Sequence, residues 1–258
     1  MPGLSGDDAG YVIWAKSLLN GGGLDYTNEP HVRESGFVLF TLPVLLMPFV
    51  YISDNIAVYK IVSLLFSAFS ILLFLNYIKA RFKSEKLITA SVLILIFNGM
   101  FFEYSHQIMA ENIFIFFTLF SIIAAEKYEK TDNVFNWNLI FVLTLSIISY
   151  FTRAAGIPLI ASIIIYFFLK SPKKAVIITI LFLIFFLLFF GIKNFGKPAE
   201  KEKYSSIILM KSQYEPEAGL RSIGETLSDA GRKFFVYSLR LVPDMFFYPF
   251  FKNVKPSA

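Results

Sequence analysis

The pattern of apolar and polar residues divides the chain into a short patterned N-terminal segment, a long apolar middle and a polar C-terminal part. In the first segment, apolar residues recur at helical spacing over residues 9–19, and the glycines at 21–23 end the pattern. Asp7 and Asp8 stand where a helix cap belongs. The spacing predicts an external amphipathic helix within residues 5–24, with its apolar face on a membrane surface.

The apolar middle accounts for most of the chain. Residues 36–53 are interrupted by Pro43 and Pro48, which predicts a broken or half-embedded helix. Residues 56–192 predict about six membrane spans. The predicted apolar segments are 56–78, 87–102, 113–125, two short helices within 139–169 that are separated at Arg153, Gly156 and Pro158, and 175–192.

Residues 193–258 are more polar and predict an external loop followed by an interfacial C-terminal segment. The loop is expected to contain a helix or two, with Glu225 and Arg232 near its middle, and the apolar stretch 234–251 is cut up by prolines and charges. The predicted fold is therefore all-α. It is a polytopic transmembrane helical bundle over residues 1–192, with an external helix near its N-terminus and an external polar loop near its C-terminus.

The basic residues predict the orientation in the membrane. Lysine and arginine cluster over residues 79–86 and again over 170–174, and such clusters mark cytoplasmic loops. Both clusters give one topology, in which the acidic N-terminal helix, Glu111 and Arg153 lie on the outer face. We expect a multi-pass protein of a prokaryotic plasma membrane, with its polar chemistry on the extracytoplasmic side.

Composition narrows the possible functions. With 56% hydrophobic residues, the chain lies outside the range of ordinary soluble domains. It has no cysteine, which excludes disulfides and thiolate chemistry, and two histidines make a histidine-rich metal site an unfavourable interpretation. The formal net charge of +5 fits cytoplasmic loops, and no basic stripe interleaves with aromatic residues, so nucleic acid is not an expected partner.

Polar residues gathered on one side of the membrane fit an enzyme that draws a lipid-borne substrate from the bilayer. They also fit a passive receptor or scaffold. Each candidate has a purely structural interpretation as well. Asp8 caps its helix, Glu111 favours a helix N-terminus through the helix dipole, and Arg153 bonds carbonyls freed at Gly156 and Pro158.

The order of these residues resembles the amino-terminal half of the C-type glycosyltransferases, the polytopic enzymes related to protein mannosyltransferases and the lipid A aminoarabinose transferase. The segments that carry the resemblance are GDDAGYVIWAKSLLNGGGL, SHQIMAENIFIFFTLFSIIAAEKY and YFTRAAGIPLIASIIIYFFLK, within roughly residues 5–170. The external loop QYEPEAGLRSIGETLSDAGRKFFVYSLRLVP is also of a kind seen in bacterial members.

The resemblance implies transfer of a sugar from a polyprenyl-phosphate donor to a lipid, glycan or protein acceptor on the outer face. It implies Asp7 as general base, with Glu111 as a second catalytic carboxylate, and Arg153 on the donor phosphate. A divalent cation between the acidic residues is one alternative, and no other cofactor is expected. The further substrate-binding candidates are Asp8, Tyr11, His106 and Arg232.

Members of the family begin with a membrane helix before the acidic loop, whereas Asp7 follows Met1 by only six residues, and they continue with several helices after the long loop. We therefore expect the chain to be a fragment, or its start to be mis-assigned, and the isolated product to be inactive. The competing hypothesis is a non-catalytic membrane protein, such as a lipid or glycan carrier component or an assembly partner.

Overall fold

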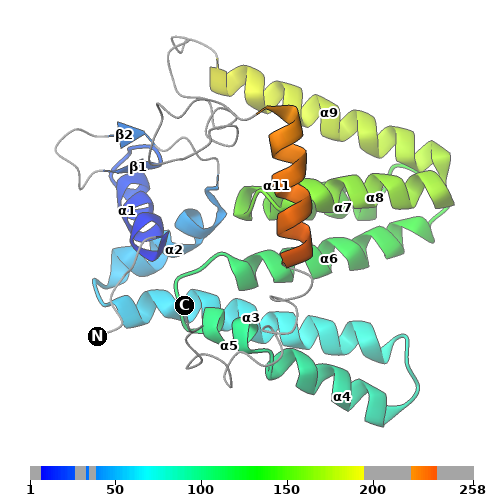
Figure 1. Ribbon diagram of the computed structural model, residues 1–258, viewed down its shortest axis with the longest axis horizontal. Coiled ribbons are helices and arrows are strands. Elements are labelled where there is room, and N and C mark those ends of the chain that lie inside the picture. The colour runs from blue at the N-terminus through cyan, green and yellow to red at the C-terminus, as the bar shows by residue number, and fades with distance from the viewer. Residues whose placement is uncertain (1–6, 27–32, 35–38, 195–221, 237–258) are drawn as a thin grey trace. The chain divides into compact units, whose positions relative to one another are not determined.

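A computed structural model describes residues 7–26, 33–34, 39–194 and 222–236 (Figure 1). The chain divides into two compact units, one of residues 1–95 and 104–197 and the other of residues 96–103 and 198–258. The described residues are helical except for their turns and one short antiparallel pair, β1 (Asp25–Tyr26) and β2 (Arg33–Glu34). The prediction of an all-α fold is confirmed.

The predicted N-terminal helix is α1 (Asp7–Leu19), and it packs on α2 (Thr41–Ile52) (Figure 1). Val12 and Ala15 of α1 are buried in one apolar cluster with Leu42 and Leu46 of α2. The sequence interpretation placed this face on a membrane surface. That placement is wrong, because periodicity shows which face of a helix is apolar but not what packs on it. Here the apolar face of α1 packs on α2.

Glycine ends α1. Gly21 has a φ of 78°, which side-chain-bearing residues rarely adopt, and the Gly22 N–H donates to the Ser17 carbonyl at 2.9 Å. At the other end, the helix already includes Asp7, so Asp7 and Asp8 lie in its first turn rather than at a cap position. Carboxylates in a first turn still favour the positive end of the helix dipole.

The proline-interrupted segment forms one continuous helix, α2, which corrects the expectation of a broken helix. Pro43 lies in the first turn, where its missing N–H has no partner to lose, and Pro48 is accommodated inside. A side-chain hydrogen bond from Thr41 to the Ile148 carbonyl, 3.3 Å, ties the start of α2 to a later helix.

Two long helices, α3 (Ile56–Lys79) and α6 (Glu111–Glu129), run parallel and pack together. Near the N-terminus of α6, Asn112 donates to Ser67, midway along α3, at 2.7 Å in a fully buried contact. Near their C-terminal ends the Tyr77 hydroxyl donates to Glu126 at 3.2 Å. These polar contacts at the two ends of α6 fix its direction and position along α3.

The largest apolar cluster joins α6 to α7 (Trp137–Thr152), α8 (Gly156–Lys170) and α9 (Pro172–Asn194). The stretch predicted as two short helices is α7 and α8, separated at residues 153–155 as expected. Gly156 lies against the α7 backbone, because a Cβ built on it would be 2.4 Å from the Tyr150 Cα. The absence of a side chain therefore allows the two helices to meet at this turn.

Two of the described helices, α3 and α9, are long and apolar enough to cross a membrane. A third crossing results if α4 (Glu85–Ile96) and α5 (Gly99–Ser105) are counted as one bent span. The apolar helices α2, α7 and α8 have 12, 16 and 15 residues and are shorter than a full crossing needs. This content of apolar helix indicates a membrane protein.

The first unit has two unlike ends (Figure 1). The turns after α3, α6 and α8 meet at one end, where Arg81 forms an ion pair with Glu126, and where Lys174 at the start of α9 donates to carbonyls at the end of α6. The opposite end carries α1, α2 and the start of α6. The two basic clusters, residues 79–86 and 170–174, thus share an end.

Lys174 is buried and closes the C-terminus of α6. Its ammonium donates to the carbonyls of Tyr128 and Glu129, each at 2.9 Å, and to that of Thr131. A cation at this position satisfies carbonyls that the helix leaves without partners and opposes the negative end of its dipole.

Replacing Lys174 by methionine is expected to lower the free energy of unfolding by about 2–3 kcal/mol, because the buried carbonyls lose a charged donor. Exposed Lys173 next to it provides the matched control, and Lys173→Met should change stability by less than about 0.5 kcal/mol. Equilibrium unfolding in mixed micelles compares the two variants. Equal midpoints would show that the carbonyls do not depend on Lys174.

The second unit contributes α11 (Ile223–Val236), which lies in the loop predicted to hold a helix and includes Glu225 and Arg232. Ser222 and Glu225 form a reciprocal capping box. The Glu225 N–H donates to the Ser222 hydroxyl at 3.2 Å, and the Ser222 N–H donates to the Glu225 carboxylate at 2.7 Å. Most of the apolar segment 234–251 lies outside the described residues.

Candidate functional site

Glu111 and Arg153 form an ion pair, although 42 positions separate them in the chain. Glu111 is the first residue of α6, and Arg153 is the residue that ends α7. Because α6 and α7 form an antiparallel hairpin, the start of the first helix and the end of the second lie together. The structure thus brings together a carboxylate and a guanidinium that the sequence placed on one face of the protein.

The backbone at the end of α7 presents Arg153 in an extended conformation, with φ −150° and ψ 144°. The N–H of Arg153 donates to the Ser149 carbonyl at 3.0 Å, and its carbonyl accepts from the Gly156 N–H at 2.9 Å. The helix break is therefore closed by backbone bonds. Within the described residues, the Arg153 side chain pairs with Glu111 rather than with carbonyls of the break, which corrects the structural interpretation of this residue.

Each charge also stands at a helix end of opposite sign, Glu111 at the N-terminus of α6 and Arg153 at the C-terminus of α7. The Glu111 side chain is 21% exposed and the Arg153 side chain 41% exposed. A guanidinium has five N–H donors, and one carboxylate oxygen uses only some of them. Arg153 can therefore bind an anion from solvent while it stays beside Glu111.

The acidic helix α1 packs at the same end. Its Val12 and Ala15 share a buried cluster with Ala110 and Ile113, which lie one position before and two positions after Glu111 in the chain. Asp8 of α1 is itself buried, at 8% exposure. Asp7 is the first residue of α1, and its side chain lies outside the described part of the structure.

The remaining candidates differ in their placement. Tyr11 lies on the partly buried side of α1 and packs edge-on against Trp14, with ring centroids 5.7 Å apart. His106 is exposed in the turn before α6, five positions before Glu111. Arg232 belongs to α11 in the second unit, where it forms an ion pair with Asp229 at 2.8 Å.

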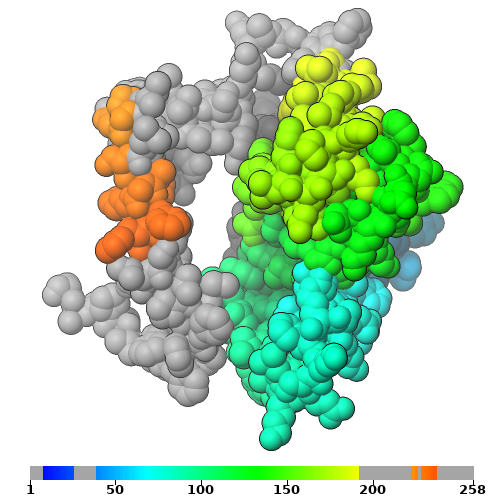
Figure 2. All heavy atoms as spheres, turned by 90° about the vertical axis from the view of Figure 1, so that its right-hand side faces the viewer, coloured from blue at the N-terminus to red at the C-terminus, as the bar shows by residue number. Residues whose placement is uncertain are grey.

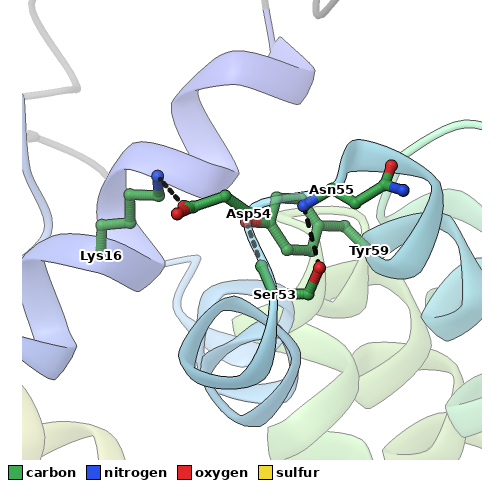
Figure 3. A network of polar contacts seen from close by, with 5 residues as sticks. All are labelled: Lys16, Ser53, Asp54, Asn55 and Tyr59. Atoms are coloured by element: carbon green, nitrogen blue, oxygen red, sulfur yellow. Dashed lines mark hydrogen bonds and ion pairs between the residues drawn. The ribbon is translucent and has the colours of Figure 1, made fainter.

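Sequence reasoning missed one polar contact at this end. Lys16 of α1 donates to Asp54, between α2 and α3, at 2.9 Å (Figure 3). The Tyr59 hydroxyl donates to the Ser53 carbonyl at 2.7 Å and supports the same turn. The opposite charges of Lys16 and Asp54 were the available signal, but nothing local in the sequence shows that the two residues meet.

The Asp54 carboxylate, through its hydrogen bond to Lys16, holds the pKa of that ammonium above its ordinary value of 10.5. A raised lysine pKa in the folded state adds stability below the unfolded pKa, and this stability is lost as pH rises through the folded pKa. Since both side chains are largely exposed, Asp54→Asn should cost at most about 1 kcal/mol. That difference from wild type should persist from pH 7 to pH 9 and shrink above pH 10.5; pH-dependent chemical unfolding measures it.

No group of three or more histidine, aspartate or glutamate side chains within the described ranges could hold a metal ion. The Glu111 carboxylate already forms an ion pair with the Arg153 guanidinium, so it is not a free ligand for a metal ion. The chemistry that this pair supports directly is anion binding by Arg153.

No family model matches the chain, and comparison with the curated proteins and with the solved structures finds no significant match.

Proposed function

We propose that the chain is an integral-membrane glycosyltransferase of the C type that takes its sugar from a polyprenyl-phosphate donor on the extracytoplasmic face. The observation that carries the proposal is the Glu111–Arg153 ion pair beside the acidic helix α1. In this proposal the chain crosses a prokaryotic plasma membrane about six times, and the basic turns lie in the cytoplasm.

In the proposed reaction, Arg153 binds the donor phosphate, and Asp7 accepts the proton of the acceptor hydroxyl. The bond from the acceptor oxygen to the anomeric carbon forms while the bond from that carbon to the phosphate oxygen breaks. Polyprenyl phosphate leaves with the electron pair, and Arg153 stabilises its developing charge. Glu111 holds the guanidinium in place through the ion pair and serves as the second carboxylate of the site.

A direct test measures sugar transfer from polyprenyl-phosphate sugars in membranes that contain the protein. Asp7→Asn should lower the rate by about 10²- to 10⁴-fold, since it removes a general base. Asp54→Asn is the matched control, because Asp54 is an exposed acid at the same end of the first unit. Equal rates for wild type and Asp7→Asn would reject Asp7 as the base.

One observation favours the non-catalytic alternative, a carrier component or assembly partner. Glu111 and Arg153 already neutralise each other, as a pair with a purely structural role would. That alternative predicts normal function in cells for Asp7→Asn, and loss of function only in variants that disturb helix packing.

A further inference from the structure

A groove of about 360 Å³ lies between the C-terminal part of α3 and α4, at the end of the first unit that carries the basic turns. Figure 2 looks onto this end, with α3 and α4 in cyan. The apolar lining of the groove comes from both helices: Leu75 of α3, and Ile88, Val92 and Leu93 of α4. The volume falls within the range of small-molecule sites.

Helix α4 is largely uncovered along this groove. Its sequence, EKLITASVLILI, is apolar after the first turn, yet none of its residues is buried within the described structure. An apolar helix whose side chains meet little protein needs another apolar partner. In a membrane protein, lipid chains can supply that contact.

The mouth of the groove is polar and lies in a basic segment. Lys79 and Glu85 line it, and Lys83 and Lys86 are close in sequence. None of the ammonium groups of these three lysines forms a hydrogen bond or an ion pair with any residue that the structure describes. Arg81 differs from them, because it pairs with Glu126 and lies over the Tyr77 ring.

We propose that this groove binds an anionic glycerophospholipid of the phosphatidylglycerol type. One acyl chain lies along the apolar lining, and the phosphate binds Lys79. Three lysines, Lys79, Lys83 and Lys86, outnumber the single carboxylate of Glu85, and this excess of positive charge favours a headgroup with net negative charge. Glu85 accepts hydrogen bonds from the glycerol hydroxyls, so the one acidic residue in the lining also has a partner.

This lipid site is separate from the proposed transfer site. From Glu111 to Glu126, α6 extends about 22 Å at the rise of an α-helix. The groove mouth lies near the Glu126 end, because Arg81, two residues after Lys79, pairs with Glu126. The lipid phosphate proposed to bind Lys79 is therefore distinct from the donor phosphate proposed to bind Arg153. The lipid site does not depend on the proposed function.

The test measures lipid binding to the purified full chain in detergent, by native mass spectrometry with phosphatidylglycerol, phosphatidylethanolamine or phosphatidylcholine of equal chain length. Wild type should retain phosphatidylglycerol at least about tenfold more tightly than phosphatidylcholine. Lys79→Gln should remove that preference, and Val92→Trp should weaken retention by filling the groove. Lys173→Gln, at an exposed lysine on the same end, should leave retention unchanged.

Several outcomes would overturn the proposal. Equal loss in Lys79→Gln and Lys173→Gln would mean that the lipid responds only to surface charge. Equal retention of phosphatidylglycerol and phosphatidylcholine would remove the headgroup assignment, and tighter retention of phosphatidylethanolamine would show that Glu85 binds an ammonium instead. Wild-type retention in Val92→Trp, with an unchanged melting temperature, would show that the acyl chain lies elsewhere.

Discussion

Replacing Arg153 by glutamine is expected to lower sugar transfer by about 10²- to 10³-fold, the usual effect of removing one donor that stabilises developing charge. The change removes the only described cation that pairs with Glu111 and, in the proposed reaction, the group that binds the leaving phosphate. The measurement is the rate of transfer at saturating donor in membranes, normalised to the amount of folded protein.

A structural role for Arg153 would also lower the rate, so a second variant separates the two roles. Arg153→Gln leaves Glu111 without its partner, whereas the double variant Glu111→Gln, Arg153→Gln leaves no unpaired charge. If the pair only holds α6 against α7, the double variant should recover both stability and transfer. If Arg153 binds phosphate, the double variant should recover stability and stay at least as slow as Arg153→Gln.

Gly156→Ala is expected to give the largest loss of stability, about 3 kcal/mol or more. The added Cβ would be 2.4 Å from the Tyr150 Cα and 2.5 Å from the Tyr150 nitrogen. These are backbone atoms of α7, so the clash is relieved only if α8 moves away from α7. Because Arg153 lies in the turn between the two helices, the Glu111–Arg153 pair should be displaced as well.

The control for this variant is Gly191→Ala in α9, where a Cβ would have no neighbour within 4 Å. In a helix, alanine is favoured over glycine by about 0.5–1 kcal/mol, so this change should be neutral or stabilising. Equilibrium unfolding in micelles compares the two variants. Similar unfolding free energies for Gly156→Ala and Gly191→Ala would contradict the close approach of α7 and α8.

Local signals predicted much of the helix order. The break between α7 and α8 follows from the charge, glycine and proline close together in TRAAGIP, and the end of α1 follows from its glycine run. Glu111 and Arg153 could be assigned to one face because alternating crossings place every second turn on the same side. Their direct contact is a finding of the structure.

Contacts that depend on which segments meet could not be predicted in this way. The apolar face of α1 was visible as a pattern in the sequence. The sequence did not show whether protein or lipid would contact that face, because its contact with α2 joins segments that are distant in the chain. Lys174 looked like one more lysine of a basic turn, and only the folded structure places it on the carbonyls at the end of α6. The continuity of α2 through Pro48 was also not predicted, because a proline inside a helix removes a backbone hydrogen bond and usually kinks or breaks the helix.

The central claim is that the Glu111–Arg153 end and the basic-turn end of the first unit face opposite sides of a membrane. The chain has no cysteine, so each single-cysteine variant carries one thiol. A membrane-impermeant maleimide applied to intact cells tests His106→Cys against Lys173→Cys, both at exposed positions. The account predicts labelling of His106→Cys from outside and of Lys173→Cys only after permeabilisation; labelling of both from the same side would contradict it.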